Sequence, residues 1–486
     1  MEHIKKSSYQ LEIDNVYNSS NCNIIIEAGP GSGKSFTILG LLNQTQKFKK
    51  CILVAFNKSI KEELETKVPA NVEVKTIHGL AYSILRANVF KRFKVTAYKN
   101  FVLGKKHLNL EKLKPKDRDV YLFLVSKIID LSRLNLCQNK ADIEEICTQY
   151  NISTLNGEID DAISLMKYLD KYNLSDQKEM MIDYTDMLWL TYSMVRPENF
   201  PRYNVVFCDE LQDLNPLQKC IVENIINTTN GRFIGVGDKR QSIYSFMGAN
   251  VQAFESFKNR PNTVTLPLSV TYRCSKAVTN KANEVFHGLE SFENNCEGEV
   301  RDGKLTEVKD GDFVICRNNM PLIESWIDIV KQGKKAHILG KDFGKSLLFL
   351  ISKLDTHKDF ATGVTKILKD KEEELKKKGF AKPTSNSNYQ SLVEKLSIIK
   401  LLKDEFGSFE IMREKVEEIF TDDNKSSGVV LSTIHKMKGL EADNVFFLQS
   451  GLIPSKYAET VTEFYQEQCL MYVAVTRAKI NLIYVD

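Results

Sequence analysis

The sequence predicts an α/β fold with two parallel sheets, each interrupted by a mainly helical insertion. Short runs rich in Val, Ile and Phe recur along the 486 residues, with helical stretches between them. Continuous apolar strands that alternate with helices are typical of parallel sheets covered by helices on both faces. One sheet would use strands within residues 23–76 and 204–268, and the other would use strands within residues 312–340 and 428–485.

Two long, strand-poor segments determine the domain boundaries that we expect. The second of these segments contains a charge-laced helix, "KILKDKEEELKKKGF", followed by "AKPTSNSN", the most linker-like stretch in the chain. The expected parts are a first sheet domain (1–78 and 184–266), its helical insertion (79–183), a second sheet domain (267–344 and 428–486) and a reduced insertion (345–427).

Composition favours a folded protein whose binding surfaces are local. The chain is 42% hydrophobic and 27% charged, with a net charge of +4, so any nucleic-acid site must be a groove of Lys and Arg rather than a basic surface overall. The ten cysteines include no Cys-x-x-Cys pair, which argues against a zinc ribbon, an iron–sulfur cluster or a disulfide framework. The N-terminus lacks an apolar signal core, and no apolar run approaches the ~20 residues of a membrane span. We therefore expect a cytoplasmic protein without a membrane partner.

A glycine-rich loop follows the first predicted strand, in the sequence "NIIIEAGPGSGKSFT" of residues 23–37. Strand, loop and helix in this order are the context of a phosphate-binding loop, here with Ala28 in place of the usual first glycine. Backbone N–H groups would face the phosphates, Lys34 would reach the β and γ oxygens, and Ser35 would ligate Mg²⁺. A glycine-rich turn before an ordinary helix is the alternative interpretation. The predicted nucleotide contacts here are Ala28, Gly29, Pro30, Gly31, Ser32, Gly33, Lys34, Ser35 and Phe36.

An apolar run ending in two acids, "NVVFCDELQD" at residues 204–213, supplies the second indication of ATP chemistry. It places Asp209 and Glu210 at the carboxyl end of a buried strand, where open parallel sheets bind their ligands. Asp209 could hold Mg²⁺, and Glu210 could orient or deprotonate the attacking water. For an isolated Asp-Glu pair, a solvated acidic turn would be the better interpretation. The preceding phosphate loop favours the catalytic one, because phosphoryl transfer needs both a cradle and a metal-holding acid.

Four further stretches carry polar and cationic residues at strand ends. They are "VGDKRQSIYSFMGA" (236–249), "TYRCSKAV" (271–278), "LSTIHKMKGLEADNVF" (431–446) and "LMYVAVTRAKINLIYV" (470–485). With the phosphate loop and the acidic strand end, they resemble in order and spacing the motifs of superfamily 1 helicases of the UvrD, Rep and PcrA type. The resemblance runs from "YQLEID" to the last strand and weakens across the two insertions. It implies two RecA-like motor domains of the P-loop NTPase class.

The resemblance also implies roles for residues around ATP. Gln10 would read the adenine, and Gln241 would sense the γ-phosphate. Arg273 and Arg477 would contact the phosphates, a task suited to a planar, permanently charged guanidinium. The alternative interpretation is that each of these arginines forms only an ion pair on the surface. Tyr272 would lie beside the adenine, and Glu441 would hydrogen-bond the ribose. The implied catalytic set is Lys34, Asp209, Glu210, Gln241, Arg273 and Arg477, with Ser35 and Asp209 as ligands of Mg²⁺.

Residues implied to contact single-stranded DNA lie in "VAFNKSIKEEL" (54–64), "KTIHGLAYSILR" (75–86) and two of the later motifs. Phe56 and Tyr244 could stack on bases, which contributes about 1–3 kcal/mol per base and tolerates any sequence. The alternative interpretation is that Phe56 and Tyr244 are buried residues of the hydrophobic core. The chain departs from the family pattern where Phe246 and Met247 replace a usual Trp and Arg, and where Ala442 replaces a common Phe. The implied DNA contacts are Phe56, Asn57, Lys58, Thr76, His78, Tyr244, Phe246 and His435.

The first insertion contains a stretch that interleaves aromatic and basic residues, "RANVFKRFKVTAYKNFVLGKKH" at residues 86–107. Phe90, Phe93, Tyr98 and Phe101 alternate there with Lys and Arg, a pattern that suits a nucleic-acid face and equally an amphipathic helix with solvated lysines. At the end of the insertion, "MIDYTDML" (181–188) resembles the family segment that re-enters the first motor domain.

These observations together predict an ATP-dependent DNA helicase that moves 3′ to 5′ on single-stranded DNA and uses ATP and Mg²⁺. Its expected partners are single strands and single-strand/duplex junctions, and its expected location is the DNA in the cytoplasm. Two alternatives stay open. One is a DNA-dependent ATPase that remodels protein–DNA complexes. The other is the motor subunit of a nuclease or antiviral defence complex of the Gabija type, in which any cutting would belong to a partner.

Overall fold

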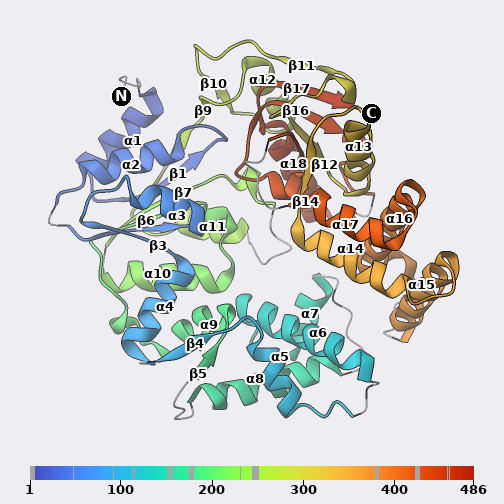
Figure 1. Cartoon of the computed structure of the whole chain (residues 1–486). Helices are drawn as coiled ribbons and strands as arrows, with labels where there is room; N and C mark the ends of the chain where they lie inside the picture. Colours follow the sequence, from blue (N-terminus) through green and yellow to red (C-terminus); the bar gives the residue numbers. More distant parts are fainter. Residues whose placement is uncertain are drawn as a thin grey trace. The chain divides into compact units, whose positions relative to one another are not determined.

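The structure is a computed structural model in which two compact units succeed one another along the chain, Met1–Ser269 and Val270–Asp486 (Figure 1). Each unit contains one large sheet built wholly of parallel strands, which confirms the predicted α/β class. Among the residues described, no helix is both long enough and apolar enough to cross a bilayer. The described residues are 6–47, 49–90, 92–111, 113, 115–149, 152, 157–174, 180–229, 231–243, 251–377, 383–421, 427–456, 458 and 460–486.

The sheet of the first unit has six strands in the order β3-β2-β6-β7-β1-β8. Its strands pair in parallel throughout, so all their carboxyl ends lie along one edge. The polar residues that follow the strands are therefore brought to this edge. The strands are β1 (Asn23–Ala28), β2 (Cys51–Ala55), β3 (Val72–Thr76), β6 (Val205–Cys208), β7 (Arg232–Gly237) and β8 (Thr263–Leu268).

Helices cover both faces of this sheet, because successive apolar residues of each strand point to opposite faces. Ile24 and Ile26 of β1 belong to one buried cluster, and Ile25 between them belongs to the other. Helices α1 (Ser8–Ser19), α2 (Lys34–Gln44) and α3 (Lys58–Glu65) contribute to the first cluster. Helices α4 (Ile77–Asn88), α9 (Tyr184–Met194), α10 (Pro216–Thr229) and α11 (Val251–Lys258) contribute to the second.

The first insertion has its own hydrophobic core of four helices, which includes Leu122, Val125, Leu165 and Leu169. Two short parallel strands, in which Phe93 pairs with Met180, bring the start and the end of the insertion together. Strands of three residues carry too little periodicity to be predicted from sequence. Phe90 and Phe93 pack partly buried against the core of the first unit, whereas Tyr98 is 60% exposed. The elements are β4 (Phe93–Val95), α5 (Lys99–His107), α6 (Pro115–Leu134), α7 (Lys140–Gln149), α8 (Glu158–Leu174) and β5 (Met180–Ile182).

A buried charge cluster joins these helices to α9. Asp186 of α9 has no exposed surface; its Oδ2 accepts a hydrogen bond from Nζ of Lys99 and its Oδ1 one from Nη1 of Arg133, both at 2.7 Å. Lys99 also donates to Oδ1 of Asn173 at 2.8 Å. Burial lowers the pKa of Lys99, although Asp186 opposes the change. Removing one member of such a cluster leaves an uncompensated buried charge, which costs more stability than the intact cluster provides.

We therefore expect Asp186→Asn to lower the free energy of unfolding of the first unit by about 3–5 kcal/mol, the range for a broken buried ion pair. Urea unfolding followed by Trp189 fluorescence measures this change in a Trp326→Phe background, where Trp189 is the single remaining tryptophan. Asp160→Asn is the control, because Asp160 pairs with Lys140 and both side chains are more than half exposed. Equal unfolding midpoints for the two variants would contradict the expectation.

The sheet of the second unit has seven strands in the order β11-β17-β16-β12-β15-β13-β14, and its neighbours also pair in parallel. The outermost strands, β11 and β14, lie outside the predicted strand segments because one is mostly polar and the other has two residues. The strands of the sheet are β11 (Glu299–Asp302), β12 (Phe313–Cys316), β13 (Ala336–Leu339), β14 (Phe420–Thr421), β15 (Val429–Thr433), β16 (Ala442–Leu448) and β17 (Ala478–Val485); β9 (Val270–Thr271) and β10 (Glu290–Ser291) form a separate pair.

Three helices of the second insertion contribute buried residues to the hydrophobic cluster of the sheet, and a fourth packs against that cluster with partly buried side chains. Leu347, Ile399 and Met412 belong to the same buried set as Val314 and Leu431 of the strands. The helices of this unit are α12 (Lys276–Val285), α13 (Met320–Lys331), α14 (Lys341–Leu354), α15 (Phe360–Lys377), α16 (Ser387–Phe406), α17 (Phe409–Ile419) and α18 (Val461–Val475). Short 3₁₀ turns along the chain are η1 (Pro197–Asn199), η2 (Leu211–Asp213), η3 (Lys239–Gln241), η5 (Leu305–Glu307), η6 (Pro383–Ser385), η7 (Ile434–Met437) and η8 (Ser450–Leu452).

Candidate nucleotide and nucleic-acid site

The predicted nucleotide residues of the first unit gather at the carboxyl edge of its sheet. Glu27 of β1 lies opposite Gly237 of β7, and Cys208 of β6 lies opposite Gly235. The phosphate loop, the Asp209–Glu210 pair and the turn that starts at Asp238 therefore leave three neighbouring strands side by side. An open parallel sheet binds its ligands at this edge.

The glycine-rich loop has the backbone geometry that its sequence predicts. Gly31 (φ 67°) and Gly33 (φ 81°) are left-handed, a conformation that glycine adopts without a steric penalty. Gly33 is the N-cap of α2, and no side chain caps the free N–H groups of that helix end. The Ser32 hydroxyl is buried and has no hydrogen-bond partner among the described residues. Free helix N–H groups and an unused buried hydroxyl together fit an anion such as a phosphate.

Lys34 spans the gap between the loop and the acidic strand end. Its Nζ lies 2.6 Å from Oε1 of Glu210, and both side chains are more than four-fifths buried. Burial lowers the pKa of Lys34, but the nearby carboxylates of Glu210 and Asp209 outweigh it, so the net pKa is raised. Lys34 is therefore a permanent cation beside the loop.

The two acids differ in their surroundings. Asp209 is 5% exposed; burial and then Glu210 raise its pKa to about 6, while Lys34 lowers it. Glu210 has a left-handed backbone (φ 51°), which turns the chain sharply after β6. A non-glycine residue in this conformation is uncommon and often marks a functional position.

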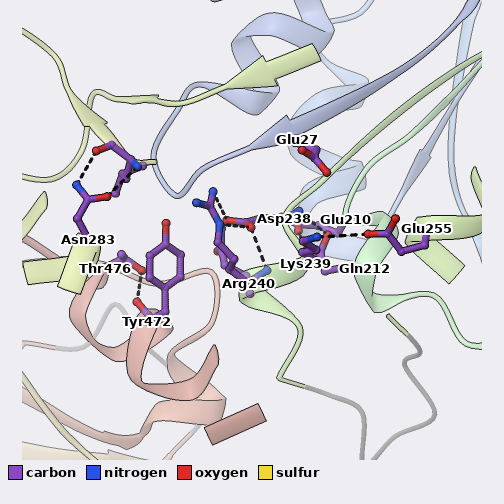
Figure 2. A network of polar contacts seen from close by, with 12 residues as sticks. Glu27, Glu210, Gln212, Asp238, Lys239, Arg240, Glu255, Asn283, Tyr472 and Thr476 are labelled. Carbon is purple, nitrogen blue, oxygen red and sulfur yellow. Dashed lines mark hydrogen bonds and ion pairs between the residues drawn. The ribbon is translucent and has the colours of Figure 1, made fainter. Parts of the chain in front are cut away.

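Glutamines tie this acidic turn to the next strand end, as Figure 2 shows for Glu210, Gln212 and Asp238. The Gln212 amide donates to Oε2 of Glu210, and its Oε1 accepts from the N–H of Asp238 at 3.0 Å. Oδ2 of Asp238 in turn accepts from Nε2 of Gln241 at 3.0 Å. This chain of bonds connects the predicted water-activating acid to the predicted γ-phosphate sensor.

The raised pKa of Asp209 predicts how stability depends on pH. The pKa of about 6 exceeds the ordinary value of about 3.9, so the folded chain loses stability as pH rises through this interval. Lys34→Ala removes the cation that limits this loss and raises the pKa of Asp209 further. We expect the stability difference between the parent and Lys34→Ala to widen between about pH 6 and pH 8. Urea unfolding without nucleotide or metal measures it, with Lys58→Ala, a change at an exposed residue, as the control. A pH-independent difference would contradict the expectation.

The donor set fits Mg²⁺ held partly by a nucleotide. No group of three or more His, Cys, Asp or Glu side chains suited to a metal occurs within the described ranges. Mg²⁺ in nucleotide sites usually has one or two protein ligands and takes the rest from phosphates and water. Ser35, which is exposed at the start of α2, and Asp209 agree with that pattern, and their role stays a prediction.

Gln10 lies at the first turn of α1 and is 2% exposed. Its Nε2 donates to Oγ1 of Thr37 at 3.1 Å, and its Oε1 accepts from the N–H of Ser7 at 3.0 Å. Since Thr37 is in the first turn of α2, the structure brings Gln10 beside the phosphate loop. Phe36 is 38% exposed at the same helix end.

In the second unit, Arg273 and Glu441 form an ion pair with one another, and Lys479 lies 3.8 Å from Glu441. Tyr272 packs against Phe292, with 4.9 Å between the ring centroids. The resemblance assigns Arg273 to phosphate and Glu441 to ribose, so this pair would have to open for both roles. Those roles stay predictions.

Arg477 is 2% exposed and held at the carboxyl end of α18. Its Nε donates to the carbonyl of Val473 at 3.0 Å, and its Nη2 donates to Oγ1 of Thr476 at 3.3 Å. The Thr476 hydroxyl donates to the carbonyl of Tyr472 at 2.8 Å (Figure 2). A cation is favoured at this helix end, because the free carbonyls carry partial negative charge.

The predicted DNA contacts of the first unit come from two adjacent strand ends. Ala55 of β2 pairs with Thr76 of β3, so Phe56 and the residues after Thr76 begin at the same level of the sheet edge. Phe56 is 39% exposed, which excludes its alternative as a core residue. Asn57 and Thr76 cap α3 and α4 through their side chains, and the neighbouring Lys58 is exposed.

The two predicted DNA-facing histidines are neutral at physiological pH, because burial lowers the pKa of His78 and lowers that of His435 to about 4. Arg317, which forms a two-bond ion pair with Glu467, adds to the effect at His435. The predicted contacts Tyr244 and Phe246 lie outside the described residues.

Two residues of the site were missed in the sequence, Gln212 and Asp238. Both lie in the quoted stretches "NVVFCDELQD" and "VGDKRQSIYSFMGA". Their signal was available, since each is a polar residue immediately after a buried strand. Gln212 has no exposed surface, and a Cβ added at Gly237 would clash with its side chain. Gly237 therefore makes room for the amide that bridges the two strand ends.

Comparison with protein families matches both units. A model described as the UvrD/REP helicase N-terminal domain covers residues 10–262, and one described as the UvrD-like helicase C-terminal domain covers residues 329–485. The chain belongs to the UvrD-like helicases. The N-terminal match covers the phosphate loop, the acidic strand end and the Gln241 turn, and ends just before β8.

Several proteins named as DNA helicases are similar to this chain in sequence, at low identity. The F-box DNA helicase protein 1 of Schizosaccharomyces pombe is 25% identical over 95% of this chain and 55% of its own length. The F-box DNA helicase 1 of Gallus gallus is 24% identical over 93% of this chain and 46% of its own. The ATP-dependent DNA helicase Rep of Buchnera aphidicola is 25% identical over 60% of this chain and 45% of its own. The chain thus spans about half the length of these relatives.

Proposed function

We propose that this UvrD-like helicase is an ATP-dependent motor that moves 3′ to 5′ along single-stranded DNA and separates strands at duplex junctions. The names of its relatives, which are DNA helicases, support the reaction class. The direction rests on the family resemblance. ATP and Mg²⁺ are the proposed cofactors.

One observation carries the proposal: a single sheet edge bears both sets of groups that a DNA-driven ATPase needs. The phosphate loop and Lys34 follow β1, and Glu210 follows β6, while Phe56 follows β2 and Thr76 ends β3. Strand β2 lies directly between β3 and β6. If DNA binding moves the ends of β2 and β3, β2 would therefore transmit the movement to β6 and the acidic turn that follows it.

Each residue of the edge has a chemical task in this proposal. The N–H groups of the loop and the Lys34 ammonium bind the phosphates and offset their charge. Lys34 then leaves Glu210, which frees that carboxylate to accept a proton from water. Gln212 holds the carboxylate of Glu210 in place, and Mg²⁺ supplies charge neutralisation when bound.

An ATPase and strand-displacement assay tests the function. Duplexes with a 3′ tail, a 5′ tail or blunt ends are compared at equal DNA concentration. The proposal expects ATP turnover stimulated by single strands and displacement of the 3′-tailed duplex alone. Turnover without displacement would favour the alternative of a motor that remodels protein–DNA complexes. Displacement of only the 5′-tailed duplex would overturn the direction, and turnover unaffected by DNA would overturn the motor itself.

We expect Glu210→Gln to lower DNA-stimulated turnover by about 10²–10⁴-fold, the usual contribution of a general base, while nucleotide affinity is retained. The amide keeps the shape of the carboxylate but cannot take a proton. Single-turnover hydrolysis and equilibrium nucleotide binding measure the two quantities separately. Glu223→Gln is the matched control, because Glu223 is a partly buried glutamate that pairs with Lys219 within α10. Turnover at the parent rate would show that Glu210 is not the base.

A further inference from the structure

A small pocket of about 110 Å³ lies in the first unit where the inserted helices α5 and α6 meet the start of α9. Its lining residues come from the segments 97–101, 123–130 and 183–185. Pockets that bind whole small molecules have volumes of about 300–1,000 Å³. This pocket is therefore suited to one flat ring or one side-chain head group.

Exposed aromatic side chains form the rim of the pocket. Tyr98, Phe123 and Tyr184 are 60%, 52% and 58% exposed, although large aromatic side chains usually contribute to cores. Phe101 packs against Phe123, with 4.6 Å between the ring centroids, and Nζ of Lys105 lies 4.5 Å from the centroid of Phe101. The rim thus offers π-faces to a ring, while Nζ of Lys105 also lies 2.9 Å from Oδ1 of Asp119.

Hydrogen-bond acceptors form the floor. Asn100 is 4% exposed, and its Nδ2 lies 3.4 Å from Oδ1 of Asp130. That contact fixes the amide so that Oδ1 is the free atom, and this oxygen has no hydrogen-bond partner among the described residues. Asp183 also lines the pocket and is 6% exposed. Burial raises the pKa of Asp130 to about 6 and that of Asp183 to about 7, and Oδ1 of Asp183 accepts from the N–H of Asp186 at 2.7 Å.

Buried acceptors under an aromatic rim select a flat ring that donates N–H groups. Cytosine and adenine carry such donors on their exocyclic amines, whereas thymine presents a carbonyl oxygen at the same position. A thymine carbonyl would face Oδ1 of Asn100, an amide oxygen that cannot donate, without a hydrogen bond. The floor therefore favours amino-bearing bases.

The pocket adjoins the predicted DNA contacts. The ring of Tyr184 meets the ring of His78 edge-on, with 6.4 Å between the centroids and 79° between the planes. His78 follows β3 at the sheet edge, in the group that includes Phe56 and Thr76. A strand that lies on this edge thus passes within one aromatic contact of the pocket.

We propose that this pocket, the base pocket, binds one unstacked nucleobase with an exocyclic amino group from the single strand held by the first unit. The inference rests on the proposed function for the presence of a DNA strand. It adds a preference among bases that the stacking contacts of a sequence-tolerant motor do not provide.

Fluorescence anisotropy of the whole chain with labelled dC and dT 20-mers at equal salt tests the proposal. One buried hydrogen-bonded base edge gives an expected preference for dC of about 5- to 100-fold. Asn100→Ala should lower the dC affinity and so bring the dC and dT affinities together. Phe123→Ala, a change at an exposed side chain, should weaken both affinities by about 5- to 100-fold through loss of stacking. Phe349→Ala is the control, because Phe349 is 59% exposed on α14 in the other unit.

Three outcomes would overturn the base pocket. Equal binding of dC and dT by the parent chain, with intact single-strand affinity, removes the base pocket and leaves the proposed function standing. A preference for dC that survives Asn100→Ala moves the selectivity to another site. Binding of an arginine-rich peptide that Asn100→Ala abolishes, without any base preference, would assign the pocket to a protein side chain. Absence of all single-strand binding would instead contradict the proposed function.

Discussion

Parallel strand pairing in the first sheet is the constraint on which the rest of the site depends. Six strands that run in one direction bring all their carboxyl ends to one edge, so segments from residue 28 to residue 241 meet there. The Lys34–Glu210 ion pair is a consequence of this geometry, since β1 and β6 each lie next to β7.

Residues that act at strand ends could be predicted from the sequence, because a buried strand followed by a charged residue is a local pattern. Asp209 was found in that way, Lys34 was found from the glycine-rich loop that follows β1, and Phe56 came from the family resemblance. Contacts between distant segments could not be predicted so readily. The bridge from Gln212 to Asp238 depends on the order of β6 and β7 in the sheet, and strand order is not written in either segment. An ion pair was the alternative for Arg273, and the structure shows one, but its partner Glu441 could not be identified from the sequence because the two residues are far apart in the chain.

The two insertions show how far periodicity predicts packing. Their helical character follows from the spacing of apolar residues, but the partner of each apolar face does not. Helices α5 to α8 form a core of their own, whereas α14, α16 and α17 share the core of the second sheet. Helix length does not explain the difference, because α15 and α16 of the second insertion have 18 and 20 residues and α5 and α7 of the first have 9 and 10.

The charge cluster around Asp186 connects the independent core of the first insertion to the motor sheet. Asp186 and the pocket residue Asp183 belong to one capping box at the start of α9, in which each side chain accepts from the other's N–H. The same carboxylate of Asp186 holds Lys99 and Arg133 from the inserted helices. Any shift of the insertion against α9 must therefore change the floor of the base pocket. Because burial makes partial separation of these charges costly, the insertion and α9 are expected to move as one body. A base held in the pocket would then follow the motor sheet rather than slide over it.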